Sequence, residues 1–241
     1  MVAQLLVLVH GLAGTGQVWD GVTRLASDRW NGPVHAPDLA GHGCAPRLAN
    51  YDYESYAAAI VAGIPPEHKG LETVLVGHSL GGVVALVAAS DHGLNPRGVV
   101  GVGMKIVWSD DEIAGIEKIA TRPVDHYPRK ADAIDRYLKV SGLAGLIGPE
   151  HPAAAAGVVG RDGRWGLATD PAAYTVTRPD MAALTRDRAY RIILASGADD
   201  VMAPRAQLGP DHLDIRELAE VGHNAHVQNP ELIWSLIAEL D

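Results

Sequence analysis

A serine flanked by glycines follows a short apolar run of the sequence. The segment Gly77-His78-Ser79-Leu80-Gly81 comes directly after Thr73–Val76 and precedes an apolar stretch that begins at Val83. Small residues two positions on either side of a serine permit a sharp turn from a strand into a helix, which exposes the hydroxyl group. A serine before a helix can also be an N-cap. Because an N-cap does not require the flanking glycines, we interpret Ser79 as a nucleophile.

A serine hydroxyl group is a weak nucleophile at neutral pH, so it needs a neighbouring base, and histidine suits that role best. The sequence has 11 histidines. His223 stands out because it lies on a loop between the last predicted strand and the C-terminal helix, where reacting groups gather in open α/β sheets. His226 is the alternative three residues further on. We choose His223, because Gly222 allows a tight turn before it, whereas His226 suits local packing at the entry to the helix.

The third residue of such a site is a carboxylate, which orients the histidine ring and stabilises its charged form. Two aspartates qualify, Asp199 and Asp200, in the loop after the predicted strand Arg191–Ala195. The resulting chain order is serine, aspartate, histidine. That order is typical of α/β hydrolases and differs from the order in the chymotrypsin and subtilisin folds.

These residues require a scaffold, and the pattern of apolar runs predicts an α/β fold. Four runs read as buried strands of a parallel sheet: Leu5–Val9, Thr73–Val76, Gly98–Val102 and Arg191–Ala195. Two weaker candidates are Pro33–Ala36 and Leu213–Leu218. Helical patterns lie at Gln17–Ala26, Tyr53–Ala62, Ser79–Asp91 and Pro230–Leu240. The alternation predicts a doubly wound parallel sheet of about six strands.

Residues 105–187 interrupt this alternation. They contain helix-like stretches at Asp111–Ala120 and Lys130–Val140 but no clear strand, and glycine and proline recur between them and the next strand. We therefore expect a helical cap at 105–187, inserted in a core made of residues 1–104 and 188–241. Such a cap commonly shapes a substrate pocket. Four aromatic residues in it are expected to pack the cap, with pocket lining as the alternative: Trp108, Tyr127, Tyr137 and Trp165.

Together these motifs resemble those of the α/β-hydrolase superfamily, over most of the chain outside 105–187. His10-Gly11 is similar to the family's oxyanion-hole turn, and Pro37–Gly43 to its loop after the next strand. Gly77–Gly81 resembles the nucleophile elbow, and Gly222-His223 the loop of the catalytic histidine. The resemblance implies that Asp200, in the pattern G-x-x-D-x-x-x-P, is the acid and Asp199 its neighbour. It also implies an all-parallel sheet that lacks the two leading antiparallel strands of larger members.

Oxyanion stabilisation in such a site comes from two backbone N–H groups, which by position belong to Leu12 and Leu80. The leading hypothesis is hydrolysis of a small carboxylic ester or related acyl compound through an acyl-serine intermediate. Ser79 would attack, His223 would carry the proton and Asp200 would orient His223. The same residues also suit a C–C bond hydrolase, a thioesterase or a lyase, and a capped pocket suits a non-catalytic small-molecule receptor, because fold alone does not determine function.

The composition narrows the choice of partners. Twenty Lys and Arg against 29 Asp and Glu give a net charge of −9, which disfavours nucleic acid and anionic membranes as partners. A single cysteine, Cys44, excludes an internal disulfide, and Leu5–Val9 is too short for a membrane anchor, so we expect a cytoplasmic protein. Neither a dinucleotide fingerprint nor a zinc pattern is present. We expect a small-molecule substrate and no cofactor or metal, and make no prediction of oligomeric state.

Overall fold

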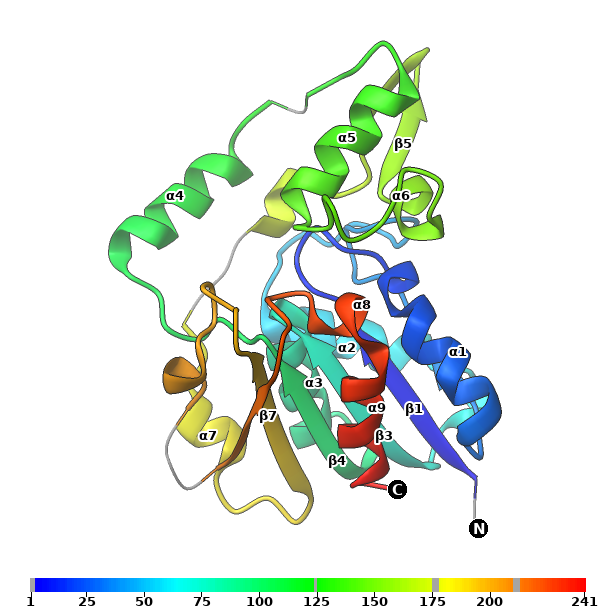
Figure 1. Ribbon diagram of the computed structural model, residues 1–241, viewed down its shortest axis with the longest axis vertical. Coiled ribbons are helices and arrows are strands. Elements are labelled where there is room, and N and C mark those ends of the chain that lie inside the picture. Colours follow the sequence, from blue (N-terminus) through cyan, green and yellow to red (C-terminus); the bar gives the residue numbers. More distant parts are fainter. Residues whose placement is uncertain (1–2, 124, 175–177, 210–212) are drawn as a thin grey trace.

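The sheet that carries the site has six parallel strands. A computed structural model describes residues 3–123, 125–174, 178–209 and 213–241. Within these residues the strand order of the main sheet is β2-β1-β3-β4-β7-β8 (Figure 1). The strands are β1 (Gln4–Val9), β2 (Val34–His35), β3 (Glu72–His78), β4 (Asn95–Val102), β7 (Arg191–Gly197) and β8 (Asp214–Leu218). The predicted doubly wound, all-parallel sheet is thus confirmed.

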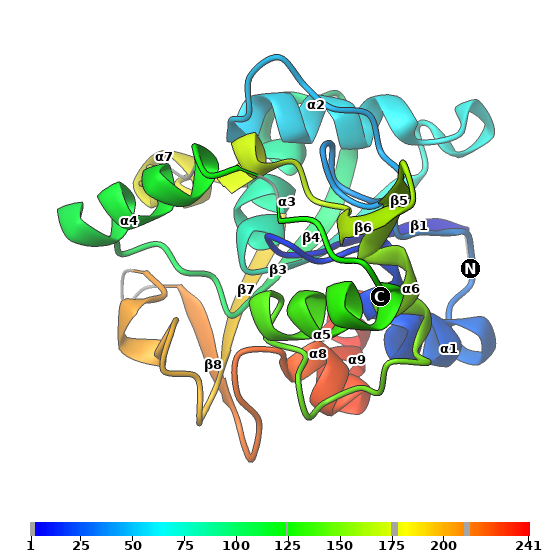
Figure 2. The same cartoon turned by 90° about the horizontal axis from the view of Figure 1, so that it is seen from above.

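Helices cover both faces of this sheet, as the view from above shows (Figure 2). One face carries α1 (Asp20–Arg29), α8 (Ala225–Gln228) and α9 (Pro230–Ala238), and the other carries α2 (Tyr53–Gly63), α3 (Leu80–Asp91) and α7 (Met181–Thr185). Alternate residues of each strand join the two buried clusters: Leu6 and Leu8 pack with the first layer, whereas Leu5 and Val7 pack with the second. Because both faces are buried, the strands are continuous apolar runs in the sequence.

The strand order changes direction between β1 and β3, which are neighbours although β2 separates them in the sequence. Val9 at the end of β1 pairs with Gly77 near the end of β3. The loops that follow these two strands therefore leave the sheet side by side. In doubly wound folds a ligand binds at such a switch point, outside the carboxyl ends of the strands.

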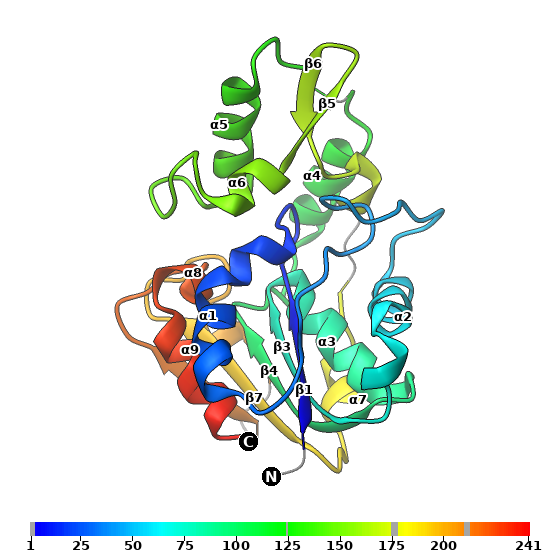
Figure 3. The ribbon, with the colours of Figure 1, turned by 90° about the vertical axis from the view of Figure 1, so that its right-hand side faces the viewer.

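Most of the segment 105–187 lies above this end of the sheet (Figure 3), but its last helix, α7, packs on the sheet face beside α3. It contains α4 (Asp110–Ala120), α5 (Lys130–Val140), α6 (Pro152–Ala156), β5 (Val158–Arg161) and β6 (Arg164–Leu167). Elsewhere and within this segment the described chain also forms short 3₁₀ helices, which are η1 (Gly16–Trp19), η2 (Pro66–His68), η3 (Pro171–Tyr174) and η4 (Arg205–Gln207). The division into core and cap stays a prediction, and its three ranges include positions 1–2, 124, 175–177 and 210–212, which lie outside the described residues.

The hairpin formed by β5 and β6 was not predicted from the sequence. Its turn is Asp162-Gly163, and both residues have positive φ angles, of 50° and 73°. Asp-Gly is a favoured sequence for this kind of two-residue turn, because glycine adopts positive φ without steric cost and aspartate tolerates it. The signal was therefore present, but the flanking strands of four residues each are too short to show alternation.

Candidate active site

Ser79 occupies a strained turn between β3 and α3. Its φ and ψ angles are 52° and −119°, a combination that is costly for any residue with a side chain and that surrounding structure must enforce. The Ser79 N–H donates to the Val102 carbonyl at 2.8 Å, which ties the turn to β4. Its side chain makes no capping hydrogen bond to α3, so the N-cap alternative is not observed. The hydroxyl group instead faces a cavity of about 780 Å³, here called the Ser79 cavity.

The two glycines of the motif are required by close packing of this turn. A Cβ atom on Gly77 would lie 2.1 Å from the Gly81 carbonyl oxygen, and one on Gly81 would lie 2.3 Å from the Val9 carbonyl oxygen. The first turn of α3 therefore rests directly on the backbones of β1 and β3. Any side chain at either position would push the helix away and move Ser79.

His223 and Asp200 form a hydrogen-bonded pair from the loops that follow β8 and β7. His223 Nδ1 lies 2.9 Å from Asp200 Oδ2. A carboxylate only accepts, so the proton is on Nδ1 and the lone pair is on Nε2. His223 lines the Ser79 cavity, although no hydrogen bond joins its ring to the Ser79 hydroxyl group in the described structure. Such contacts are often long until a substrate is bound.

Asp200 is held as an anion. Its side chain is fully buried, and burial raises the pKa of the Asp200 carboxyl group. The hydrogen bond and charge of His223, together with the backbone N–H groups of Ala203 and Met202, outweigh this effect, and the net result is a pKa below its usual value. Asp199 is exposed and its backbone N–H donates to the Val221 carbonyl. Of the two aspartates, only Asp200 contacts the ring of His223.

Two residues that support this pair were missed in the sequence. His78 Nε2 donates to the His223 carbonyl at 2.9 Å, and its ring lies edge-on against that of His223. Gly103, with a φ of 57°, passes so close that a Cβ atom there would lie 3.2 Å from Asp200 Oδ2 and 3.3 Å from His223 Nδ1. The signal for Gly103 was a glycine directly after the strand Gly98–Val102.

The turn after β1 lies against Ser79. A Cβ atom on Gly11 would be 2.8 Å from His78 Nδ1 and 3.1 Å from Ser79 Cβ. His10 Nε2 accepts the Leu39 N–H at 2.8 Å, so the proton is on Nδ1, which donates to the Gly11 carbonyl at 2.8 Å. The buried ring of His10 thereby fixes this turn beside the serine.

The two leucines predicted for the oxyanion hole, Leu12 and Leu80, both line the Ser79 cavity. Leu80 is the first residue of α3, so its N–H has no acceptor within the helix. The N–H of Gly14 donates to the Gly11 carbonyl and that of Gly16 to Asp38 Oδ1. Both groups are thus used within the protein and are not free to bind a phosphate, as the N–H groups of a phosphate loop are.

His226, the alternative base, lies in the core. It is 1% exposed, and its ring stacks between those of Trp19 and His78. Burial lowers the pKa of His226 to about 3, so the ring is neutral. It does not line the Ser79 cavity, and the structure brings His223 to the cavity instead.

Other residues singled out in the sequence have different surroundings. Trp108 lines the Ser79 cavity, whereas Tyr137 is buried in the core. Tyr127 and Trp165 pack against the same core. Cys44 is exposed, and its hydrogen bond to Asp38 raises the pKa of its thiol group. Among the described residues no group of three His, Cys, Asp or Glu side chains could hold a metal ion, and no helix is long and apolar enough to cross a membrane.

Comparison with known proteins places this geometry in a family. A family model described as the alpha/beta hydrolase family matches residues 6–235. A 2-succinyl-6-hydroxy-2,4-cyclohexadiene-1-carboxylate synthase of Serratia proteamaculans is 30% identical, over 94% of this chain and 88% of that protein. A pimeloyl-[acyl-carrier protein] methyl ester esterase of Methylococcus capsulatus is 40% identical, but the match covers only 35% of this chain and 30% of the esterase.

Solved structures show the same fold. The thioesterase domain from the curacin biosynthetic pathway superposes with a TM-score of 0.79 at 21% identity, covering 98% of this chain and 91% of that domain. The structure of E-2-(acetamidomethylene)succinate hydrolase superposes with a TM-score of 0.78 at 21% identity, covering 99% of this chain and 91% of that chain. The family match over nearly the whole length and these superpositions agree, and the chain belongs to the alpha/beta hydrolase family.

Proposed function

We propose that this protein is a serine hydrolase that cleaves a small carboxylic ester or a related acyl compound through an acyl-serine intermediate. The observation that carries the proposal is the convergence of two features on one cavity. Ser79 faces the cavity from a strained turn, and His223 lines it while its other ring nitrogen is hydrogen-bonded to the buried anion of Asp200. Neither strain nor a buried carboxylate is expected in a merely structural loop.

In the proposed reaction Ser79 Oγ attacks the carbonyl carbon of the substrate while His223 Nε2 takes the hydroxyl proton. The Asp200 carboxylate stabilises the imidazolium ion that forms. The N–H groups of Leu12 and Leu80 stabilise the negative charge on the substrate oxygen. The imidazolium then protonates the leaving alcohol, and water, activated by the same histidine, releases the acid and restores Ser79.

The names of the relatives support this reaction class without specifying a substrate. The Methylococcus relative is named a methyl ester esterase, and a 35% identical relative in Mycobacterium tuberculosis is named a lipase. Both matches cover about a third of this chain. The cytoplasmic location and the small-molecule nature of the substrate stay predictions.

Covalent labelling tests the proposal. A fluorophosphonate probe should label wild-type protein at Ser79, and Ser79→Ala should abolish labelling and lower kcat on a responsive ester by roughly 10³ to 10⁶. A screen of p-nitrophenyl esters of increasing acyl length would supply that ester. If Ser79→Ala retains turnover, the proposed nucleophile is wrong. If wild-type protein resists the probe and hydrolyses no ester, the cavity serves binding alone.

A second candidate uses the same residues in a non-hydrolytic reaction. It is favoured by the synthase of Serratia proteamaculans, whose match spans 94% of this chain. The two reactions differ in the fate of water, since hydrolysis incorporates a solvent oxygen atom into the product acid and an elimination or synthase reaction does not. Mass spectrometry of products formed in oxygen-labelled water would distinguish them.

A further inference from the structure

Two further cavities lie in a row next to the Ser79 cavity, along the 105–187 segment. A middle cavity of about 380 Å³ shares four lining residues with the Ser79 cavity: Ile119, Arg122, Val140 and Tyr174. A far cavity of about 590 Å³ shares Leu167 and Thr169 with the middle one. The three cavities therefore lie in a row, here called the groove, in which each neighbouring pair shares lining residues, whereas the far cavity shares none with the Ser79 cavity.

The groove is lined by more basic than acidic side chains. Its lysines and arginines are Lys105, Lys118, Arg122, Lys139, Arg136, Arg47 and Arg161, whereas its acidic residues are Glu112 and Asp125. Glu112 is already paired with Lys105 at 2.8 Å. Seven basic against two acidic residues is the reverse of the balance in the whole chain, whose net charge is −9. Clustered charge of one sign in a cleft attracts ligands of the opposite sign.

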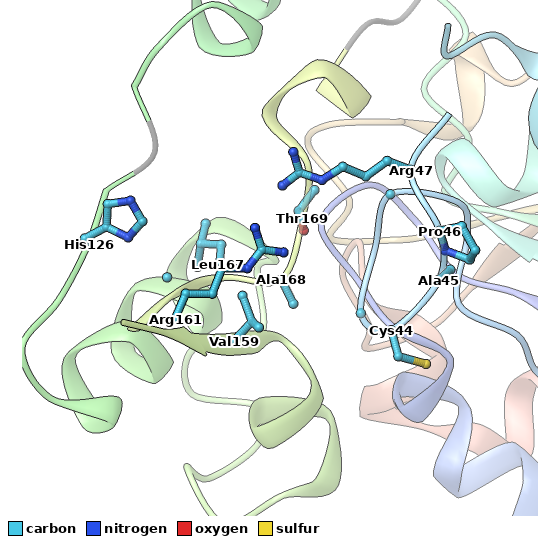
Figure 4. A pocket seen from close by; sticks show the side chains of 13 residues that line it. Cys44, Ala45, Pro46, Arg47, His126, Val159, Arg161, Leu167, Ala168 and Thr169 are labelled. Carbon is cyan, nitrogen blue, oxygen red and sulfur yellow. The ribbon is translucent and has the colours of Figure 1, made fainter. Parts of the chain in front are cut away.

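The far cavity is lined by two of these basic residues and by no acidic residue (Figure 4). Arg47 extends from the loop after β2 and Arg161 from the β5–β6 hairpin, and both side chains reach into the space near Thr169, with His126 on the far side. Arg47 Nε lies 3.4 Å from Asp170 Oδ2, which orients the arginine while 56% of its side chain stays exposed. Arg161 has no carboxylate partner in the described part of the chain. Two guanidinium groups in one cavity repel each other unless an anion lies between them.

From this geometry we propose that the far cavity binds an anionic group at the distal end of an extended substrate whose scissile carbonyl lies at Ser79. Arg47 and Arg161 would hold the anion, because the planar guanidinium group donates two parallel hydrogen bonds to a carboxylate or a phosphate. The middle cavity would hold the connecting chain. This inference rests on the proposed function for the reaction at Ser79, but the binding of the anion is independent of turnover.

Paired substrates test the inference. One series comprises monomethyl esters of linear dicarboxylic acids of increasing length, each compared with its uncharged dimethyl ester. A second series carries a terminal phosphate monoester, compared with a terminal hydroxyl group, and so separates a phosphate site from a carboxylate site. At the chain length that spans the groove, wild-type protein should prefer the charged ester. Arg161→Gln and Arg47→Gln should each lower the charged-to-neutral ratio of kcat/KM by about tenfold, since each removes charge-assisted hydrogen bonds.

The matched control is Arg129→Gln. Arg129 also lies in the 105–187 segment and its loss changes the net charge equally, but it pairs with Asp132 at the surface and does not line the groove. The charged-to-neutral ratio of kcat/KM in Arg129→Gln should equal that of wild type. Urea unfolding should show that all three variants are folded. A ratio that is unchanged in both groove variants, or that falls equally in Arg129→Gln, would overturn the inference.

Calorimetry separates this inference from the proposed function. If no ester is hydrolysed and Ser79 resists labelling, the proposed function fails, and the linear dicarboxylates and alkyl phosphates are then titrated directly into wild-type protein and Arg161→Gln. Binding to wild type that weakens about tenfold in Arg161→Gln supports the anion site. Absence of binding, or equal binding to both proteins, rejects it.

Discussion

The two oxygens of Asp200 have different partners, and this difference makes its role testable. Oδ1 accepts the backbone N–H groups of Met202 and Ala203, at 2.9 and 3.0 Å, whereas Oδ2 accepts the His223 ring proton at 2.9 Å. The backbone donors therefore fix which oxygen faces the histidine. An amide in place of the carboxylate would be oriented by the same donors, with its carbonyl oxygen toward the backbone and its NH₂ group toward His223.

For this reason Asp200→Asn should lower kcat by about 10³ to 10⁴ while leaving the fold intact. The amide NH₂ group would force the ring proton from Nδ1 to Nε2, so the nitrogen that must accept the Ser79 proton would already carry one. Steady-state turnover of the ester found in the screen of p-nitrophenyl esters measures the effect. Asp199→Asn is the matched control, because Asp199 is exposed, and it should retain near wild-type turnover. Should the loss occur at Asp199 instead, the assignment of Asp200 would be wrong.

At the scale of elements, the end of β4 supports the site from a strand that contributes none of the proposed catalytic side chains. The Gly103 N–H donates to the Ala195 carbonyl of β7 at 2.8 Å, which holds the chain beside the Asp200–His223 pair. Its positive φ lets the backbone turn there before α4. The sequence shows a glycine at the end of this strand but not its contact with the pair, because that contact joins three loops that are far apart in the chain.

Gly103→Ala should therefore lower kcat by about 10- to 100-fold, because the new methyl group would displace the hydrogen-bonded pair from its position. It should also lower the free energy of unfolding by about 1 to 2 kcal/mol, the cost of a left-handed conformation for alanine. Gly93→Ala separates the two effects. Gly93 has a similar φ of 72° but no atom within 4 Å of an added Cβ, so it should lose stability and keep kcat. Equal turnover in the two variants would remove Gly103 from the site.

At the scale of the whole molecule, the core was more predictable than the 105–187 segment because its signals are local. A buried parallel strand is a short apolar run, and the four runs that the sequence analysis reads as buried strands all lie in the main sheet. In the segment, aromatic side chains have different surroundings: Trp108 lines the Ser79 cavity, whereas Tyr137 is 1% exposed in the core. Whether such a side chain lines the cavity or lies in the core depends on packing between residues that are distant in the sequence.

The site was predictable where its signals are local, as the core was. The serine and the histidine lie in local patterns, and the structure brings Ser79, His223 and Asp200 to one region. The choice of Asp200 over Asp199 came from the family resemblance, because two adjacent carboxylates cannot be distinguished by composition. The basic groove was not predicted, since its arginines come from segments on either side of α2 and β3, and only the fold places Arg47 opposite Arg161.

At the scale of the whole molecule, several histidines are buried and neutral in the folded protein. Burial lowers the pKa values of His10, His42, His78 and His226, to about 3 for His42 and His226. The unfolded chain binds these protons near pH 6.5, so between pH 6.5 and about 3 the unfolded state binds more protons than the folded state. The free energy of unfolding should therefore fall as the pH drops below 6.5, and stay level from there to about pH 8. Asp200 adds almost nothing to this slope above about pH 5, because its pKa is lowered and its contribution is lost only in stronger acid.

His226 offers a direct test of this dependence, because its two ring nitrogens have no hydrogen-bond partner among the described residues and its ring stacks between two others. His226→Phe preserves the stacking and removes the proton. Between pH 5 and 6.5 it should reduce the slope of unfolding free energy against pH by up to about 1.4 kcal/mol per pH unit, the contribution of one proton. Urea unfolding at several pH values measures the slope, and fluorophosphonate labelling should persist because His226 does not line the Ser79 cavity.

The exposed His126 provides the control, and His126→Gln should retain the wild-type slope. A slope in His226→Phe equal to that of wild type would show that His226 binds its proton equally in the folded and unfolded states. The acid sensitivity of the fold would then have to come from the other histidines whose pKa values burial lowers, which are His10, His35, His42 and His78.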